Sequence, residues 1–156
     1  MLGHNTAQLK PISVLMVEDN IDHADLMMDA LQSFNVGNLV KHLTDGEQAI
    51  NYLKNTPPFE DTDQFPKPDI IFLDIRMPRQ GGIETLRIIK QDPDLQHLPV
   101  VMISTSSANP EVEECYSLGA SGFITKPLQF DEFSQKMKEL NYYWVLTSVI
   151  PTTPEA

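Results

Sequence analysis

The sequence contains little cysteine and few basic residues, and both shortages exclude classes of function. Its single cysteine, Cys115, excludes an intrachain disulfide and a zinc site built from cysteines. We expect it to be a small core residue on a helix. The 11 lysines and arginines stand against 22 aspartates and glutamates. The resulting net charge of −11 argues against binding to the phosphate backbone of a nucleic acid, although it still attracts metal cations.

The sequence also lacks a long apolar run and a secretory signal. No apolar segment approaches the roughly 18–20 residues that a membrane-spanning helix needs. Residues 1–11 do not have the basic and then apolar layout of a signal peptide, and we expect them to be a flexible N-terminus. These absences indicate a cytoplasmic protein without a membrane partner.

Short apolar runs alternate along the chain with segments of helical spacing. Three of the runs are apolar throughout, which is typical of a parallel sheet covered by helices on both faces. The sequence therefore predicts an α/β fold, a doubly wound parallel sheet of five strands, and 156 residues suffice for one such domain. The expected strands are residues 12–17, 38–44, 69–74, 99–104 and 121–125, and the expected helices are residues 22–34, 47–55, 83–91, 110–118 and a last one from about 130. In the helix at 83–91 the residues expected to face inward are Ile83, Leu86, Ile88 and Ile89.

Residues 55–68, NTPPFEDTDQFPKP, form a connection rich in proline and acidic residues. The segment is too polar and too interrupted to be a helix or a strand. Because it is longer than most connections in a compact domain, we expect a surface insertion.

Polar side chains follow the strands of the predicted sheet. In a doubly wound sheet, ligands bind outside the carboxyl ends of the strands, near the point where the strand order reverses. We therefore expect three carboxylates, one or two hydroxyls and one ammonium group to converge there. After the strand that ends on Asp74, Pro78 and two glycines are expected to fold the next turn out of the way. The converging residues are Glu18 and Asp19, Asp74, Ser104 and Thr105, and Lys126.

These side chains favour phosphoryl chemistry with a metal ion. Three close carboxylates repel one another unless a cation lies among them, and oxygen ligands without a neighbouring histidine or cysteine suit Mg²⁺. A lysine and a hydroxyl would complete a cage for a dianionic phosphoryl group. An aspartate in such a cage can act as a nucleophile and form an acyl phosphate.

Four stretches carry a family resemblance: VEDN at 17–20, LDIRMP at 73–78, MIS at 102–104 and GASGFITKP at 119–127. Together they resemble the receiver domain of two-component response regulators, over residues 12–140. The resemblance implies a flavodoxin-like (βα)5 sandwich, with residues 141–156 as a C-terminal helical extension. It also implies a signalling protein, not an enzyme, that accepts a phosphoryl group from a histidine kinase.

The resemblance assigns the phosphoacceptor and the metal ligands. Asp74 would receive the phosphoryl group. Glu18 and Asp19 would hold Mg²⁺ together with Asp74 and the backbone carbonyl of Arg76.

The resemblance also assigns the residues that contact and sense the phosphoryl group. Ser104 would hydrogen-bond one phosphoryl oxygen and Lys126 would pair with another, and the Lys126–Pro127 bond would be cis. Phe123 occupies the aromatic switch position, whose ring swings inward as Ser104 moves toward the phosphate. Ser104 stands where threonine is more frequent; serine keeps the hydroxyl but lacks the methyl group of threonine.

The acidic segment 55–68 and the tail 140-LNYYWVLTSVIP-151 resemble a narrower group, the stand-alone response regulators that partner bacterial phytochromes. Beyond about residue 142 the tail is apolar all round. An exposed apolar patch usually marks a partner surface, so a homodimer through the last helix and residues 141–156 is expected.

Several other side chains are expected to lie outside the site. The histidines are scattered and have no metal-ligand spacing, so we place them on the surface. The side chains of Arg76 and Arg79 could steer a kinase or a phosphate, but arginines in a loop are usually just solvated. The histidines are His4, His23, His42 and His97.

Three other functions are alternatives to the phosphoacceptor. An aspartyl-phosphate phosphatase generally wants a second aspartate two residues after the first, where this chain has Arg76. A flavin-binding domain of related topology needs a hydroxyl- and glycine-rich loop after the first strand, where this chain has the acidic VEDN. A phosphorylation-independent scaffold on the receiver fold remains open, although all the expected polar residues are present.

Overall fold

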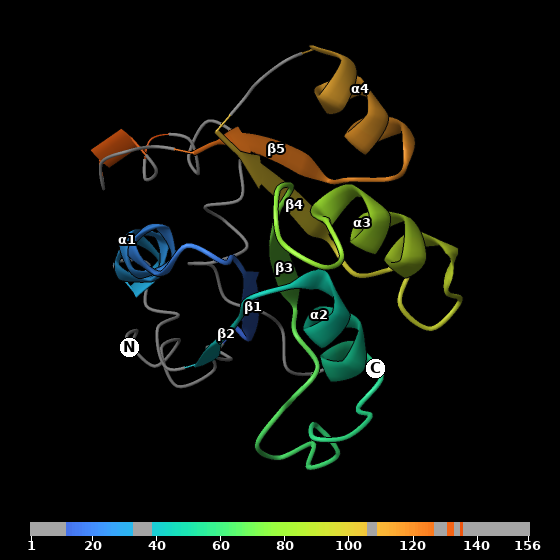
Figure 1. Ribbon diagram of the computed structural model, residues 1–156. Coiled ribbons are helices and arrows are strands. Elements are labelled where there is room, and N and C mark those ends of the chain that lie inside the picture. The colour runs from blue at the N-terminus through green and yellow to red at the C-terminus, as the bar shows by residue number, and fades with distance from the viewer. Residues whose placement is uncertain (1–11, 33–38, 106–108, 127–130, 133–134, 136–156) are drawn as a thin grey trace, which may run out of the picture.

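The strands form the parallel, doubly wound sheet that the sequence predicts. The computed structural model describes residues 12–32, 39–105, 109–126, 131–132 and 135. All neighbouring strands pair in parallel, in the order β2-β1-β3-β4-β5 (Figure 1). This order confirms the doubly wound, flavodoxin-like sheet, whose switch point lies between β1 and β3. The strands are β1 (Val14–Val17), β2 (Val40–Leu43), β3 (Ile70–Asp74), β4 (Val100–Ser104) and β5 (Gly122–Thr125).

Helices cover both faces of the sheet. Of the helices among the described residues, one lies on one face of the sheet and three lie on the other (Figure 1). Four of the predicted features fall outside the described residues. They are most of the helix expected from residue 130, the N-terminus 1–11, the extension 141–156 and the Lys126–Pro127 bond. The first helix is α1 (Ile21–Gln32), and the other three are α2 (Gly46–Leu53), α3 (Gly82–Gln91) and α4 (Asn109–Ser117).

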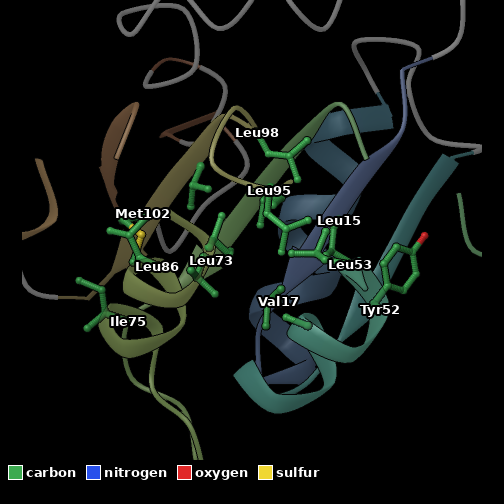
Figure 2. Packing of buried hydrophobic residues seen from close by; sticks show 14 of the residues in the cluster. Leu15, Val17, Tyr52, Leu53, Leu73, Ile75, Leu86, Leu95, Leu98 and Met102 are labelled. Carbon is green, nitrogen blue, oxygen red and sulfur yellow. The ribbon is translucent and has the colours of Figure 1, made fainter. Parts of the chain in front are cut away.

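Each face of the sheet has its own core, because alternate residues of a strand point to opposite faces. On the α1 side, Val14 and Met16 of β1 pack with Met27. On the other side, Leu15 and Val17 pack with residues of α2, α3 and α4 (Figure 2). Cys115 of α4 is fully buried in this second core, as predicted, and burial raises the pKa of its thiol to about 11.

The inward face of α3 differs from the prediction at one position. Leu86 and Ile89 are buried as expected, but Ile88 is only half-buried and belongs to neither core. Thr85 is buried in its place. The reason is helical phase, because Thr85, Leu86 and Ile89 follow Gly82 at intervals of three, four and seven residues.

The segment between α2 and β3 has neither helix nor strand, and aromatic packing anchors it to α2. The ring of Tyr52 lies 5.4 Å from Phe59 and 5.9 Å from Phe65, centroid to centroid. The Tyr52 hydroxyl donates a hydrogen bond to the carbonyl oxygen of Pro66 at 2.8 Å, and burial raises its pKa to about 12. Residues 60–64 between these anchors are exposed.

Among the described residues, no helix has the length and apolar character needed to cross a bilayer.

Candidate functional site

The register of the sheet explains why distant side chains meet at its carboxyl edge. Asp74 follows Phe72 by two residues and Lys126 follows Ile124 by two, so each pair of side chains points to the same face of the sheet. Phe72 and Ile124 both belong to the core on the α1 side. Backbone hydrogen bonds hold the strand ends in step, from Lys126 N to the Ser104 carbonyl at 2.6 Å and from Ile75 N to Ile103 O at 2.9 Å. Asp74 and Lys126 therefore emerge beside α1.

Lys126 lies at the centre of the site, and its side chain is only 7% exposed. Its ammonium group donates hydrogen bonds to Glu18 Oε2 at 3.0 Å and to Asp74 Oδ2 at 3.2 Å. A third contact, at 3.1 Å, joins Nζ to Nδ1 of His23. An ammonium group has three hydrogens. Each hydrogen of Lys126 thus has an acceptor.

The three carboxylates among the predicted metal ligands lie together. One carboxylate oxygen from each of Glu18, Asp19 and Asp74 lies within 4.8 Å of the others. Glu18 and Asp74 are buried, whereas Asp19 is exposed and leaves the cluster open on one side.

One buried oxygen in this cluster lacks a hydrogen bond. Glu18 Oε2 accepts from the backbone N–H of Asn20 at 3.0 Å as well as from Lys126. Glu18 Oε1 lies 2.8 Å from the Lys126 ammonium, but without hydrogen-bond geometry, and has no other partner in the part of the chain that the structure describes. Buried acceptors are normally satisfied. An unsatisfied carboxylate oxygen among two further carboxylates fits a hard divalent cation.

Burial changes the protonation of Asp74. The pKa of the Asp74 carboxyl is raised to about 7, chiefly by removal from water and next by the nearby charge of Glu18, while Lys126 offsets part of the rise. A cation placed among the carboxylates would favour the ionised form. Without one, the buried cluster carries more negative charge than Lys126 balances.

The turn after β3 packs tightly against the phosphoacceptor candidate. The backbone N–H of Gly82 donates to the carbonyl of Ile75 at 2.8 Å. A Cβ atom on Gly82 would lie 2.1 Å from the carbonyl oxygen of Asp74, whereas a Cβ on Gly81 would lie no closer than 3.4 Å to any neighbour. Gly82 is therefore required for close approach of α3 to the end of β3.

Two histidines were wrongly placed on the surface. His23 and His42 are both half-buried. Nε2 of His42 lies 2.7 Å from the Glu18 carbonyl oxygen, so it must carry the hydrogen. The signal for His23 was helical phase: it precedes Met27 by four residues and therefore lies on the same face of α1. His97 is exposed, as expected, and His4 lies outside the described residues.

The remaining candidates lie around this centre. Ser104 is fully buried at the end of β4, next to the end of β3, while Thr105 is exposed. Phe123 on β5 is half-buried against the core of the α2–α4 face. The Arg76 side chain is exposed and ion-paired with Glu111 of α4.

Arg79 also pairs with acidic residues outside the site. Its side chain lies 3.5 Å from Asp45 and 3.2 Å from Glu47, and it is largely exposed. Both arginines are thus held by surface ion pairs, which ordinarily contribute little to stability.

Comparison with known families gives one match over most of the chain. Residues 14–138 match the response regulator receiver domain. A probable methanogenesis regulatory protein, FilR2 of Methanothrix harundinacea, is 31% identical over 135 residues, which cover 86% of this chain and 84% of that protein. The response regulator Rcp1 of Synechocystis is 29% identical over 141 residues, 90% of this chain and 94% of Rcp1.

Solved structures of response regulators have the same fold. The phosphorylated cyanobacterial phytochrome response regulator RcpA aligns with a TM-score of 0.79 at 29% identity, covering 92% of this chain and all of RcpA (100%). The Mn²⁺-bound form of Rcp1 aligns with a TM-score of 0.77 at 29% identity, with the same coverage.

Proposed function

The chain belongs to the response regulator receiver domain family, and we propose that it is a single-domain response regulator that accepts a phosphoryl group on Asp74. The donor is a histidine kinase. The observation that carries the proposal is the position of the Lys126 ammonium, 3.2 Å from Asp74 Oδ2, inside a cluster of three carboxylates. A buried nucleophile beside a fixed cation is the arrangement that phosphoryl transfer requires.

The reaction is a simple displacement at phosphorus. An oxygen of the ionised Asp74 carboxylate attacks the phosphorus of the kinase phosphohistidine. The new O–P bond forms as the P–N bond breaks, and the electron pair of the broken bond stays on the imidazole nitrogen. Lys126 and the Ser104 hydroxyl hold the phosphoryl oxygens by charge and hydrogen bonds.

Mg²⁺ is the proposed cofactor. The side chains of Glu18, Asp19 and Asp74 and the backbone carbonyl of Arg76 would hold it, as the unsatisfied Glu18 oxygen and the clustered carboxylates support. The ion supplies charge neutralisation for the carboxylates and for the incoming phosphate. The Mn²⁺-bound form of Rcp1 shows that a similar protein takes a divalent cation.

The signal leaves the domain by a conformational change rather than by chemistry of its own. Phe123 and Ser104 would form the switch, and the face made by α4, β5 and the last helix would contact a downstream protein. We place this signalling in the cytoplasm. The input kinase is proposed to be a phytochrome, because the phytochrome response regulator RcpA shares the fold over 92% of this chain.

Incubation with acetyl phosphate tests the proposal. With Mg²⁺, the intact mass of the wild type should increase by one phosphoryl group, because the site provides nucleophile, cation and Lys126 without the kinase. EDTA should prevent the increase, and Asp74→Asn should show none. Asp25→Asn, which alters an exposed aspartate of α1, serves as the control and should react like the wild type. A folded wild type that never gains mass, from acetyl phosphate or from a phosphorylated kinase, would favour the scaffold function instead.

We also propose that the protein is a homodimer through the last helix and residues 141–156. The support is the apolar character of the tail in the sequence. Removal of residues 142–156 should therefore convert dimer to monomer, measured as the molar mass by light scattering. A truncated protein that keeps the dimer mass would place the interface elsewhere.

A further inference from the structure

We propose that His23 is a positioning residue for Lys126, holding the ammonium group in place for phosphoryl transfer through Nδ1. This inference rests on the proposed function and adds a residue to it. His23 belongs to the first turn of α1, and its backbone N–H is capped by the side chain of Asn20 at 3.0 Å. The imidazole therefore sits on a rigid element beside the strand ends.

The chemistry of the contact defines the tautomer of His23. A lysine ammonium has donors and no acceptor, so the 3.1 Å contact requires a lone pair on Nδ1. The hydrogen of the neutral ring is then on Nε2. The imidazole accepts one hydrogen of Lys126, while the other two point to Glu18 and Asp74.

A neutral acceptor suits this position better than a charged one. The site already holds three clustered carboxylates, two of which contact the one ammonium group. A fourth carboxylate would add negative charge where a dianionic phosphoryl group must enter. The imidazole fixes the ammonium from the α1 side without that charge. When Asp74 becomes an acyl phosphate, Lys126 can transfer the hydrogen bond that it gave Asp74 to a phosphoryl oxygen while His23 keeps its hold.

Replacement of His23 by leucine and by asparagine separates positioning from packing. His23→Leu removes the acceptor. His23→Asn keeps one, because Asn Oδ1 stands the same two bonds from Cβ as Nδ1 of histidine. Leaving one hydrogen of a buried ammonium without a partner lets Lys126 move, and small misplacements of a reacting group slow reactions markedly.

The rate of mass gain from acetyl phosphate in Mg²⁺ is measured against donor concentration for the three proteins. We expect His23→Leu to lower the maximal rate about tenfold at an unchanged half-saturating concentration, and His23→Asn to stay within about threefold of the wild type. A His23→Leu protein with the wild-type maximal rate, or a His23→Asn protein as slow as His23→Leu, would overturn the role of His23 alone. A wild type that gains no mass would overturn the proposed function itself.

A spectroscopic measurement tests the contact without the reaction. Nitrogen NMR of the imidazole ring in the wild type should show His23 with Nδ1 unprotonated and Nε2 protonated. Lys126→Met should shift the Nδ1 resonance, because it removes the donor, and should leave the Nδ1 resonance of His42 nearly unchanged. A proton on Nδ1 of His23, or a resonance that does not respond to Lys126→Met, would show that the contact does not exist in solution.

Discussion

Gly82→Ala is expected to destabilise the protein by about 3 kcal/mol, against the rule that alanine stabilises helices. Gly82 is the first residue of α3, where helix propensity alone favours alanine. The added Cβ would lie 2.1 Å from the carbonyl oxygen of Asp74 and 2.7 Å from the Cα of Ile75. Neither backbone atom can yield without moving the end of β3. The free energy of unfolding, measured by urea denaturation, gives the size of the effect.

Gly81→Ala is the matched control for this prediction. The same methyl group one residue earlier would meet nothing closer than the Ile75 carbonyl at 3.4 Å, an ordinary contact. Gly81 has φ of −73°, which alanine adopts without strain. We expect a change within about 1 kcal/mol. Equal stability of the two variants would show that α3 can move away from β3, and the close packing would then not constrain Asp74. If the packing does constrain it, Gly82→Ala should also slow the mass gain from acetyl phosphate.

Asp74→Asn is expected to stabilise the protein at pH 8 in EDTA, by about 2–4 kcal/mol. The pKa of Asp74 in the folded protein is about 7, raised from 3.8 by burial and by Glu18. The folded state thus holds a proton that the unfolded chain releases at much lower pH. The protonated Asp74 carboxyl makes its full contribution to the free energy of unfolding below about pH 4. That contribution is lost as the pH rises toward 7, and it changes no further above pH 7. Asparagine keeps the shape of the protonated carboxyl and removes this loss.

The difference in unfolding free energy between Asp74→Asn and the wild type isolates the effect of this carboxyl. It should grow from near zero at pH 4 to its full value at pH 8. Mg²⁺ should reduce it at pH 8, because a cation stabilises the wild-type carboxylates more than the variant. Asp25→Asn, which changes an exposed aspartate, should shift stability by no more than about 0.5 kcal/mol at either pH.

Lys126→Met should act in the opposite direction in the same experiment. It removes the cation that lies 2.8 Å from Glu18 and 3.2 Å from Asp74, and so leaves two buried carboxylates facing each other. At pH 8 in EDTA a loss of about 3 kcal/mol is expected. A stable Lys126→Met, together with an Asp74→Asn that gains nothing, would mean that the carboxylates are hydrated and that burial does not govern the site.

The sequence predicted the elements because hydrophobic period and turn residues are local signals. The apolar run before Asp74 and the run before Ser104 both appear as buried strands with bounds within one residue of those expected. Parallel pairing followed from the absence of alternation in these runs. The one error inside α3, at Ile88, arose because several apolar residues compete for one helical face, and only packing against the sheet selects among them.

The sequence predicted only those residues of the site that lie at the ends of strands. Glu18, Asp74 and Lys126 each follow or end a strand, so the rule for doubly wound sheets brought them together. His23 and His42 were missed because neither ends a strand, and an isolated histidine is usually a surface residue. Their contacts depend on the angle of α1 and on the pairing of β2 with β1, which are properties of the folded chain.

The sequence by itself determined the fold class, the family and the residues that can carry phosphoryl chemistry, because these depend on residue types at fixed positions along the chain. Tertiary structure alone decided the raised pKa of Asp74, the unsatisfied oxygen of Glu18 and the third hydrogen bond of Lys126. Each of these is set by distances between atoms on different elements and by exclusion of water. Burial and electrostatic interactions depend on all the atoms that surround a group in the folded protein, and these atoms cannot be inferred from a local pattern of residues.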